Sequence, residues 1–151
     1  MKKAFIYIFL VLFCTGSVFG GDTVDEKNIN YCMGVFTYSM NYFMLQNNEG
    51  AAKIMALQST RAAVSLMSMV YKNGKALRSD LDRFSSERQK AKVYLDKHIN
   101  KIGNEIDNCI LITNRIVKIQ ESKGIIMFGK SFQGLIREMN IELLKTYGLI
   151  K

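Results

Sequence analysis

The fold is decided by residues 25–48, which read DEKNINYCMGVFTYSMNYFMLQNN. Apolar side chains recur there at every third or fourth position, the spacing that places them on one side of an α-helix: Ile29, Cys32, Met33, Phe36, Met40, Phe43 and Met44. Asn47-Asn48-Glu49-Gly50 then supplies turn residues. The stretch predicts the first helix of the fold.

The same period recurs in later parts of the chain. A second helix is predicted from about Ala51 to Lys72, with apolar residues on two stripes and therefore contacts on two sides. A charged third helix starts at Ser79, and its stripe continues in phase to Gln120. We expect Gly103 to kink or briefly interrupt it, because one straight helix of that length would outrun its partners. The final helix is predicted from about Lys130 to Tyr147.

Strand signals are missing from this sequence. No segment shows a convincing two-residue alternation of apolar and polar residues, and residues 125–129 look like a buried linker. The chain also contains no proline, so nothing in its composition interrupts long helices. The predicted fold class is all-α: a small antiparallel bundle of four to five helices with one disulfide, preceded by a cleaved signal peptide.

The start of the chain has the pattern of a Sec-type signal peptide. Met1-Lys2-Lys3 is followed by ten apolar residues and then by small ones, and the apolar run is too short to span a bilayer. Cleavage is expected after Gly20, with Ser17 as the alternative. The predicted organisation is therefore a signal peptide over 1–20 and a single helical domain over 21–151, located in the periplasm or secreted.

Lipidation of Cys14 is the weaker interpretation of this leader, because the bulky Phe13 precedes it. Removal of residues 1–20 then leaves only Cys32 and Cys109, an even pair in an oxidising compartment, and predicts a disulfide between them. A reactive thiol is the alternative, but it would need a lowered pKa and a nearby base. Since bonded cysteines have Cα atoms within about 7 Å, the first helix should pack directly on the segment after Gly103.

Positive charge gathers in the predicted third helix and just before it. Removing Lys2 and Lys3 lowers the net charge from +8 to +6, and residues 72–101 contain nine basic against four acidic side chains. Such a stripe attracts an acidic protein or an anionic component of the envelope. A helix face that is simply exposed to solvent would have the same pattern of charges. Nucleic acid is not an expected partner, because no aromatic and basic binding motif accompanies the charge. The candidate anionic-partner surface comprises Arg83, Arg88, Lys90, Lys92, Lys97 and Lys101.

Two tyrosines of the first helix lie off its apolar stripe. Tyr38 and Tyr42 are candidate partner aromatics, because amphipathic tyrosines are enriched at protein interfaces. Packing on a neighbouring helix explains them equally well. An exposed surface of aromatic residues and methionines would also permit a homodimer.

His98 is the only histidine, so any catalytic triad or general base would have to use it. A small hydrolase using His98 with Glu105 or Asp107 is a minor alternative, because Glu105 lies seven residues on, about 10 Å along a straight helix and too far for a direct hydrogen bond. A zinc site is not expected, because the cysteines are better used as a disulfide. Haem between His98 and Met33 or Met40, or copper on methionines, is conceivable, but no catalytic, metal or cofactor site is predicted.

These observations favour a binding protein over an enzyme. The expected function is that of an exported non-enzymatic binding protein, an inhibitor or immunity-type protein or another protein-interaction module of the bacterial envelope. The alternative is a periplasmic carrier of a lipid, haem or copper in a methionine-rich helical core.

Overall fold

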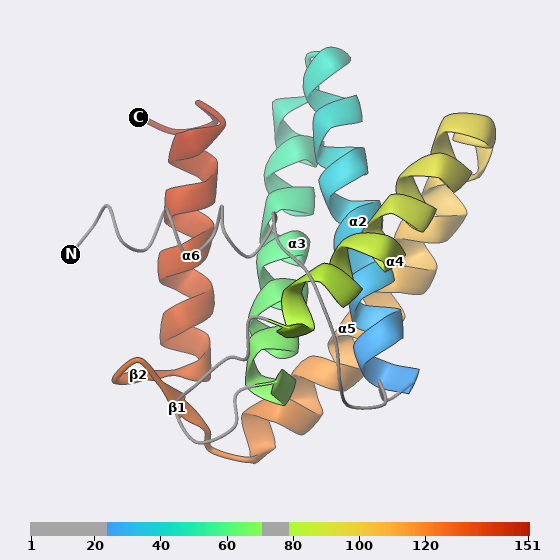
Figure 1. The fold of residues 1–151 in the computed structure, drawn as a ribbon. Coiled ribbons are helices and arrows are strands. Elements are labelled where there is room, and N and C mark those ends of the chain that lie inside the picture. The colour runs from blue at the N-terminus through green and yellow to red at the C-terminus, as the bar shows by residue number, and fades with distance from the viewer. Residues whose placement is uncertain (1–23, 71–78) are drawn as a thin grey trace.

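A computed structural model describes residues 24–70 and 79–151 of the chain. The predicted signal peptide and its cleavage site lie outside the described residues. The described parts are mostly helical, as the sequence predicted, and form five α-helices, one 3₁₀ helix and a two-stranded hairpin (Figure 1). In chain order these are α2 (Val24–Leu45), α3 (Glu49–Val70), α4 (Ser79–Lys97), η1 (Ile99–Lys101), α5 (Ile102–Ser122), β1 (Ile126–Met127), β2 (Lys130–Ser131) and α6 (Phe132–Thr146).

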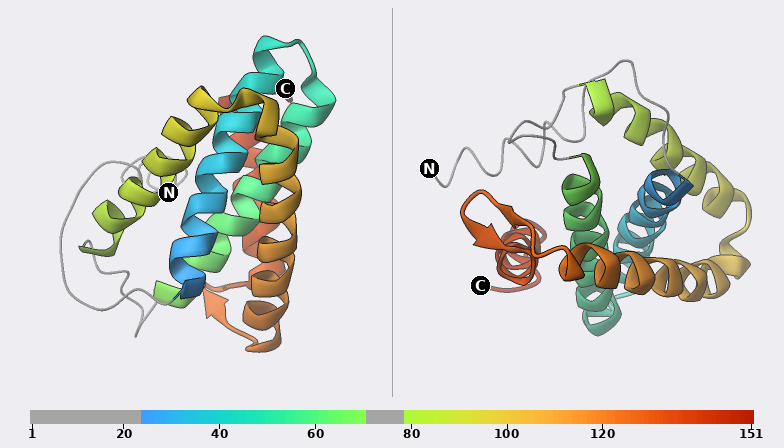
Figure 2. Two further views of the ribbon diagram at one scale, coloured as in Figure 1. Left: turned by 90° about the vertical axis from the view of Figure 1, so that its right-hand side faces the viewer. Right: turned by 90° about the horizontal axis from the view of Figure 1, so that it is seen from below.

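The helices are arranged around α2 and α3. These two form an antiparallel pair, and α2 lies between α4 and α5, which diverge on either side of it in the view from below (Figure 2). On the other side of the pair, α6 packs along α3 (Figure 1). Within residues 24–70 and 79–151, no helix combines the length and the apolar character that crossing a membrane requires.

Two hydrophobic clusters hold the helices together. The larger contains Phe36 and Met40 of α2, with apolar residues of the four other helices around them. The smaller packs α6 and the hairpin against α3 and α5: Val64, Met67, Val117, Met127, Phe132, Leu135, Ile136 and Met139. Helix α3 therefore makes contacts on two sides, as its two stripes predicted. Ile54, however, is exposed although it belongs to one of those stripes.

Helix α2 is joined to α5 by its cysteine. Cys32 and Cys109 lie at disulfide distance, with Cα atoms 5.1 Å apart and both side chains fully buried. Two polar interactions also join α2 to α5. Tyr31 Oη donates a hydrogen bond to Glu105 Oε2 (3.2 Å), and Arg115 forms an ion pair with Asp25. The predicted packing of the first helix on the segment after Gly103 is confirmed.

The sequence suggested that the third predicted helix is interrupted at Gly103, but the break occurs earlier in the chain. Helix α4 ends at Lys97, and His98 leaves the helical conformation with φ −134° and ψ 48°. Its imidazole Nδ1 donates to the Tyr94 carbonyl oxygen (3.0 Å), and the ring stacks on the Tyr94 ring, which stabilises the end of the helix. Gly103 lies in the first turn of α5.

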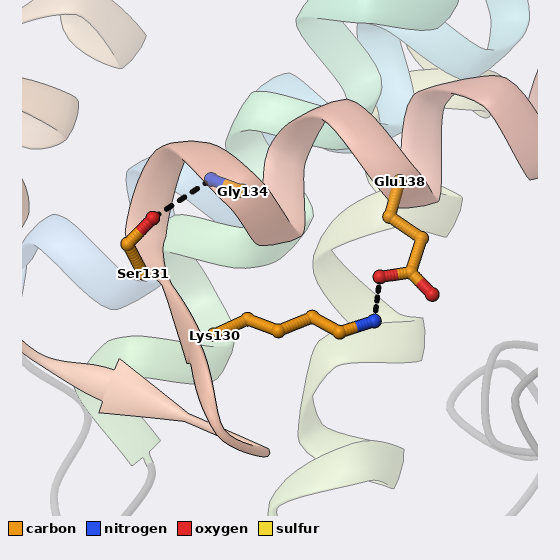
Figure 3. Close-up of polar contacts among 4 residues, drawn as sticks. All are labelled: Lys130, Ser131, Gly134 and Glu138. Carbon is orange, nitrogen blue, oxygen red and sulfur yellow. Dashed lines mark hydrogen bonds and ion pairs between the residues drawn. The ribbon is translucent and has the colours of Figure 1, made fainter.

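The segment expected to be a buried linker is a β-hairpin. Ile126 pairs with Ser131 and Met127 with Lys130, and of the residues 126–129 only Met127 is buried. With two residues per strand, the hairpin is too short for an alternating pattern to reveal it. Helix α6 begins at Phe132 rather than Lys130, because Ser131 is its N-cap and accepts a hydrogen bond from the Gly134 amide (Figure 3).

Breaking the Cys32–Cys109 pair should destabilise the protein strongly. The cysteines are 77 positions apart, and a cross-link across such a loop is worth roughly 4 to 5 kcal/mol of unfolding free energy in the chain-entropy model. Urea unfolding followed by circular dichroism, with and without reductant, measures the difference. Superimposable curves, with free thiols detected under both conditions, would show that the pair is not oxidised.

Candidate anion-binding groove

Helices α2 and α4 touch at a glycine. A Cβ built on Gly34 would lie 2.8 Å from the Arg88 Cα and 3.0 Å from the Ala91 Cβ, closer than real side chains allow. The two backbones therefore approach closely at Gly34, and no larger residue fits there without moving α4. Because α4 crosses α2 at an angle, the helices separate away from this contact (Figure 2).

The separation creates an open cavity of about 350 Å³ beside the contact, called here the α2–α4 groove. Each helix contributes residues spaced three or four apart, the period of a single helix face. Helix α2 provides Gly34, Thr37, Tyr38 and Asn41, and α4 provides Ser85, Arg88, Gln89 and Lys92.

Most lining residues are polar by type, although their apolar atoms make up most of the lining surface, and two of them carry cationic side chains. Arg88 and Lys92 are one turn apart on α4, the first half-buried and the second exposed. Thr37 Oγ1 donates to the Met33 carbonyl oxygen (2.8 Å) and lies 3.2 Å from the Ser59 hydroxyl. A guanidinium, an ammonium, hydroxyls and amides around one hollow favour a ligand group with several acceptor oxygens, such as a carboxylate.

One carboxylate already lies near this site. Partial burial raises the pKa of Tyr38, and a hydrogen bond and electrostatic interaction with Asp96 raise it further. The phenol is therefore protonated at neutral pH and acts as a hydrogen-bond donor. Asp96 follows Lys92 by one turn and places a negative charge on the same helix.

The structure divides the basic surface predicted from the sequence. Among the described side chains of that surface, only Arg88 and Lys92 line the groove. Lys90 lies two positions from each of them, about 200° around the helix, and forms an ion pair with Glu87 (2.5 Å). Lys97 shares the Lys90 stripe, since seven residues are close to two turns.

Lys101 is not among the groove residues. Lys101 is exposed in η1, and the side chain of Arg83 is outside the part of the chain whose side chains are described. Of the two candidate aromatics, Tyr38 lines the groove. Tyr42 is half-buried and packs edge-on against Phe43, with ring centroids 5.6 Å apart.

Four polar lining residues were not singled out from the sequence: Thr37, Asn41, Ser85 and Gln89. Their spacing contained a usable signal, because each pair is four residues apart, and Gln89 lies between Arg88 and Lys92 in the sequence. The missing information was tertiary. Nothing in the periodicity indicates that the polar face of α4 turns toward that of α2.

The residues considered for catalysis have other contacts. His98 caps α4 through Tyr94, while Glu105 accepts the hydrogen bond of Tyr31. Desolvation, as the main cause, and the charge of Glu105, as the second, raise the pKa of Tyr31 to about 12. The phenol therefore keeps its proton at neutral pH, and the hydrogen bond from Tyr31 to Glu105 persists. Asp107 is exposed.

Methionines belong to both hydrophobic clusters, where they fill space among other apolar side chains. Those less than a tenth exposed are Met33, Met40, Met55, Met67, Met127 and Met139. Among the described side chains, no group of three or more histidine, cysteine, aspartate or glutamate residues is placed to hold a metal ion.

Comparisons with protein-family models, with curated proteins and with solved structures found no match. What the protein does must therefore be inferred from its own residues. The α2–α4 groove combines a hollow surface with three residues that the sequence had indicated as partner-binding: Tyr38, Arg88 and Lys92.

The Gly34 contact can be tested by a single methyl group. Gly34→Ala should reduce the unfolding free energy by about 1 to 3 kcal/mol, since overpacking forces the backbones apart. Gly103→Ala is the matched control, because nothing lies within 4 Å of a Cβ there and alanine favours a helix by up to about 1 kcal/mol. Chemical denaturation compares the two variants, and equal stabilities would contradict the proposed close approach.

Proposed function

We propose that this protein is an exported, non-enzymatic binding protein that holds an acidic segment of a protein partner in the α2–α4 groove. The observation that carries the proposal is the convergence of Arg88, Lys92 and Tyr38 on one hollow. The three residues come from segments about 50 positions apart in the sequence, and the tight crossing at Gly34 brings them together.

Export is supported by the leader pattern of the sequence and by the cysteines. Cys32 and Cys109 lie at disulfide distance, and disulfides are typical of oxidising compartments. Without residues 1–20 the net charge is +6, which adds a long-range attraction for acidic partners and accelerates their encounter.

The groove would form the centre of a larger interface. Specific protein interfaces bury roughly 800 Å² on each partner, more than one hollow of this size supplies. The contact would extend from the groove along the exposed surface of α4, which includes Val93. A partner covered in this way is occluded, which is how an inhibitor or immunity-type protein acts.

The basic side chains of α4 provide a test with a matched control. A groove variant, Arg88→Gln with Lys92→Glu, and a control variant, Lys97→Gln with Lys90→Glu, change the net charge equally. Each is immobilised in oxidised form and exposed to envelope and secreted fractions, and the bound proteins are quantified by mass spectrometry. We expect a partner that the wild-type protein and the control variant retain and that the groove variant loses, with retention weakening as salt increases.

Two results would contradict the proposal. If both variants lose the partner equally, net charge rather than the groove attracts it. If the groove variant retains the partner, binding occurs elsewhere on the molecule. Circular dichroism of each variant confirms that its helices are intact before the comparison is made.

A further inference from the structure

The tip of the β1–β2 hairpin has a conformation that does not suit its sequence. Phe128 and Gly129 form the two-residue loop, and both have positive φ, 55° and 74°. Two-residue loops with both φ values positive favour Asn-Gly, because asparagine and glycine tolerate the left-handed region. A bulky aromatic residue at the first of these positions is strained.

The hairpin exposes two apolar side chains. Phe128 is 44% exposed and Ile126 is 68% exposed, so two large apolar side chains lie at the surface within three residues of each other. Figures 1 and 2 show the hairpin at the edge of the fold, at the N-terminal end of α6, where it projects away from the helices. The apolar tip is therefore convex.

The rest of the hairpin is fixed in place. Met127 is fully buried in the smaller hydrophobic cluster, and Lys130 forms an ion pair with Glu138 of α6 (Figure 3). Ser131 caps the same helix. The strands are thus anchored on both sides of the loop, and the tip is presented rigidly.

The segments that precede and follow the hairpin in the sequence are basic. Residues 118–138 contain four basic side chains, Lys118, Lys123, Lys130 and Arg137, and two acidic ones, Glu121 and Glu138. Lys118, Lys123 and Arg137 are exposed, as is Glu121, which leaves an excess of positive charge. Exposed apolar residues with an aromatic among them, next to lysines and arginines, are typical of elements that enter the interface of an anionic bilayer.

We propose that this hairpin inserts Ile126 and Phe128 into the headgroup region of an anionic lipid bilayer, while nearby basic side chains contact lipid phosphates. A convex tip of two apolar residues needs no preformed pocket in a fluid bilayer, whereas a protein partner would have to provide a matching cavity. The contact is small, so binding is weak and reversible. It is independent of the α2–α4 groove.

The chain contains no tryptophan, which makes a direct readout possible. Phe128→Trp places a single fluorophore at the tip. Leu111→Trp is the control, since Leu111 is 70% exposed on α5 and roughly 17 Å along that helix from its end. Both proteins are expressed from the whole chain, so that any processing of residues 1–20 is the same, and are mixed with vesicles of phosphatidylcholine alone or with an equal part of phosphatidylglycerol.

Insertion predicts a blue shift of the Phe128→Trp emission that is larger with the anionic vesicles, and no shift for Leu111→Trp. If the tip tryptophan keeps its emission in both vesicle types, the tip does not enter lipid. Equal shifts in the two variants would place the membrane contact elsewhere. Either of these results overturns the proposal.

A second variant separates insertion from folding. Phe128→Asn replaces a strained residue by one that the loop conformation favours, so the protein should remain folded and be at least as stable. Its partition onto anionic vesicles, measured by co-sedimentation, should fall roughly tenfold, as expected for loss of one buried aromatic side chain. Leu111→Asn should leave partition unchanged. A Phe128→Asn protein that binds vesicles like the wild type would overturn the proposal.

Discussion

The packing of α2 among three other helices is the constraint on which the rest of the structure depends. Each neighbour contacts a different residue of α2. Helix α4 packs on Gly34, where a single added methyl group would clash. Helix α5 packs on Cys32, whose Cα lies 5.1 Å from that of Cys109. Helix α3 provides small residues such as Ala52, Ala56 and Ala63 toward this core. With its position fixed by α3 and α5, α2 presents its polar side, including Thr37 and Asn41, to α4.

The two proposed surfaces arise from different parts of this arrangement. The α2–α4 groove belongs to the region around the larger hydrophobic cluster, whereas the hairpin rests on the smaller one through Met127. Figure 1 shows α4 and the hairpin on separate parts of the molecule, joined through α3 and α5. Changes at one surface should therefore leave the other intact, which allows the two proposals to fail independently.

Helical periodicity and cysteine count predicted most of the fold. They gave the all-helical class, the approximate limits of four helices and the pairing of Cys32 with Cys109, because each depends on spacing within one segment or on a simple covalent constraint. They did not give the break at His98. There a side chain, rather than a glycine, ends the helix by bonding the Tyr94 carbonyl. The hairpin was also missed, since its register depends on packing of Met127 and not on a local pattern.

The candidate site was predictable only in part, because its arrangement depends on tertiary packing. Sequence identified the basic residues of α4 and the tyrosines of α2, but it treated the charge as one surface. Helix geometry divides that surface into a stripe with Arg88 and Lys92, which lines the groove, and a stripe with Lys90 and Lys97 on another flank. Which stripe meets α2 is set by the contact of Gly34 with Arg88 and Ala91, a tertiary feature.

The most direct test of the central claim is to titrate a short polyglutamate peptide into isotope-labelled oxidised protein and follow its amide resonances by NMR. Recognition in the α2–α4 groove predicts saturable shifts concentrated at Thr37, Asn41, Gln89 and Lys92, which weaken with added salt. Shifts of equal size at Lys90 and Lys97, or none at the groove residues, would contradict the account.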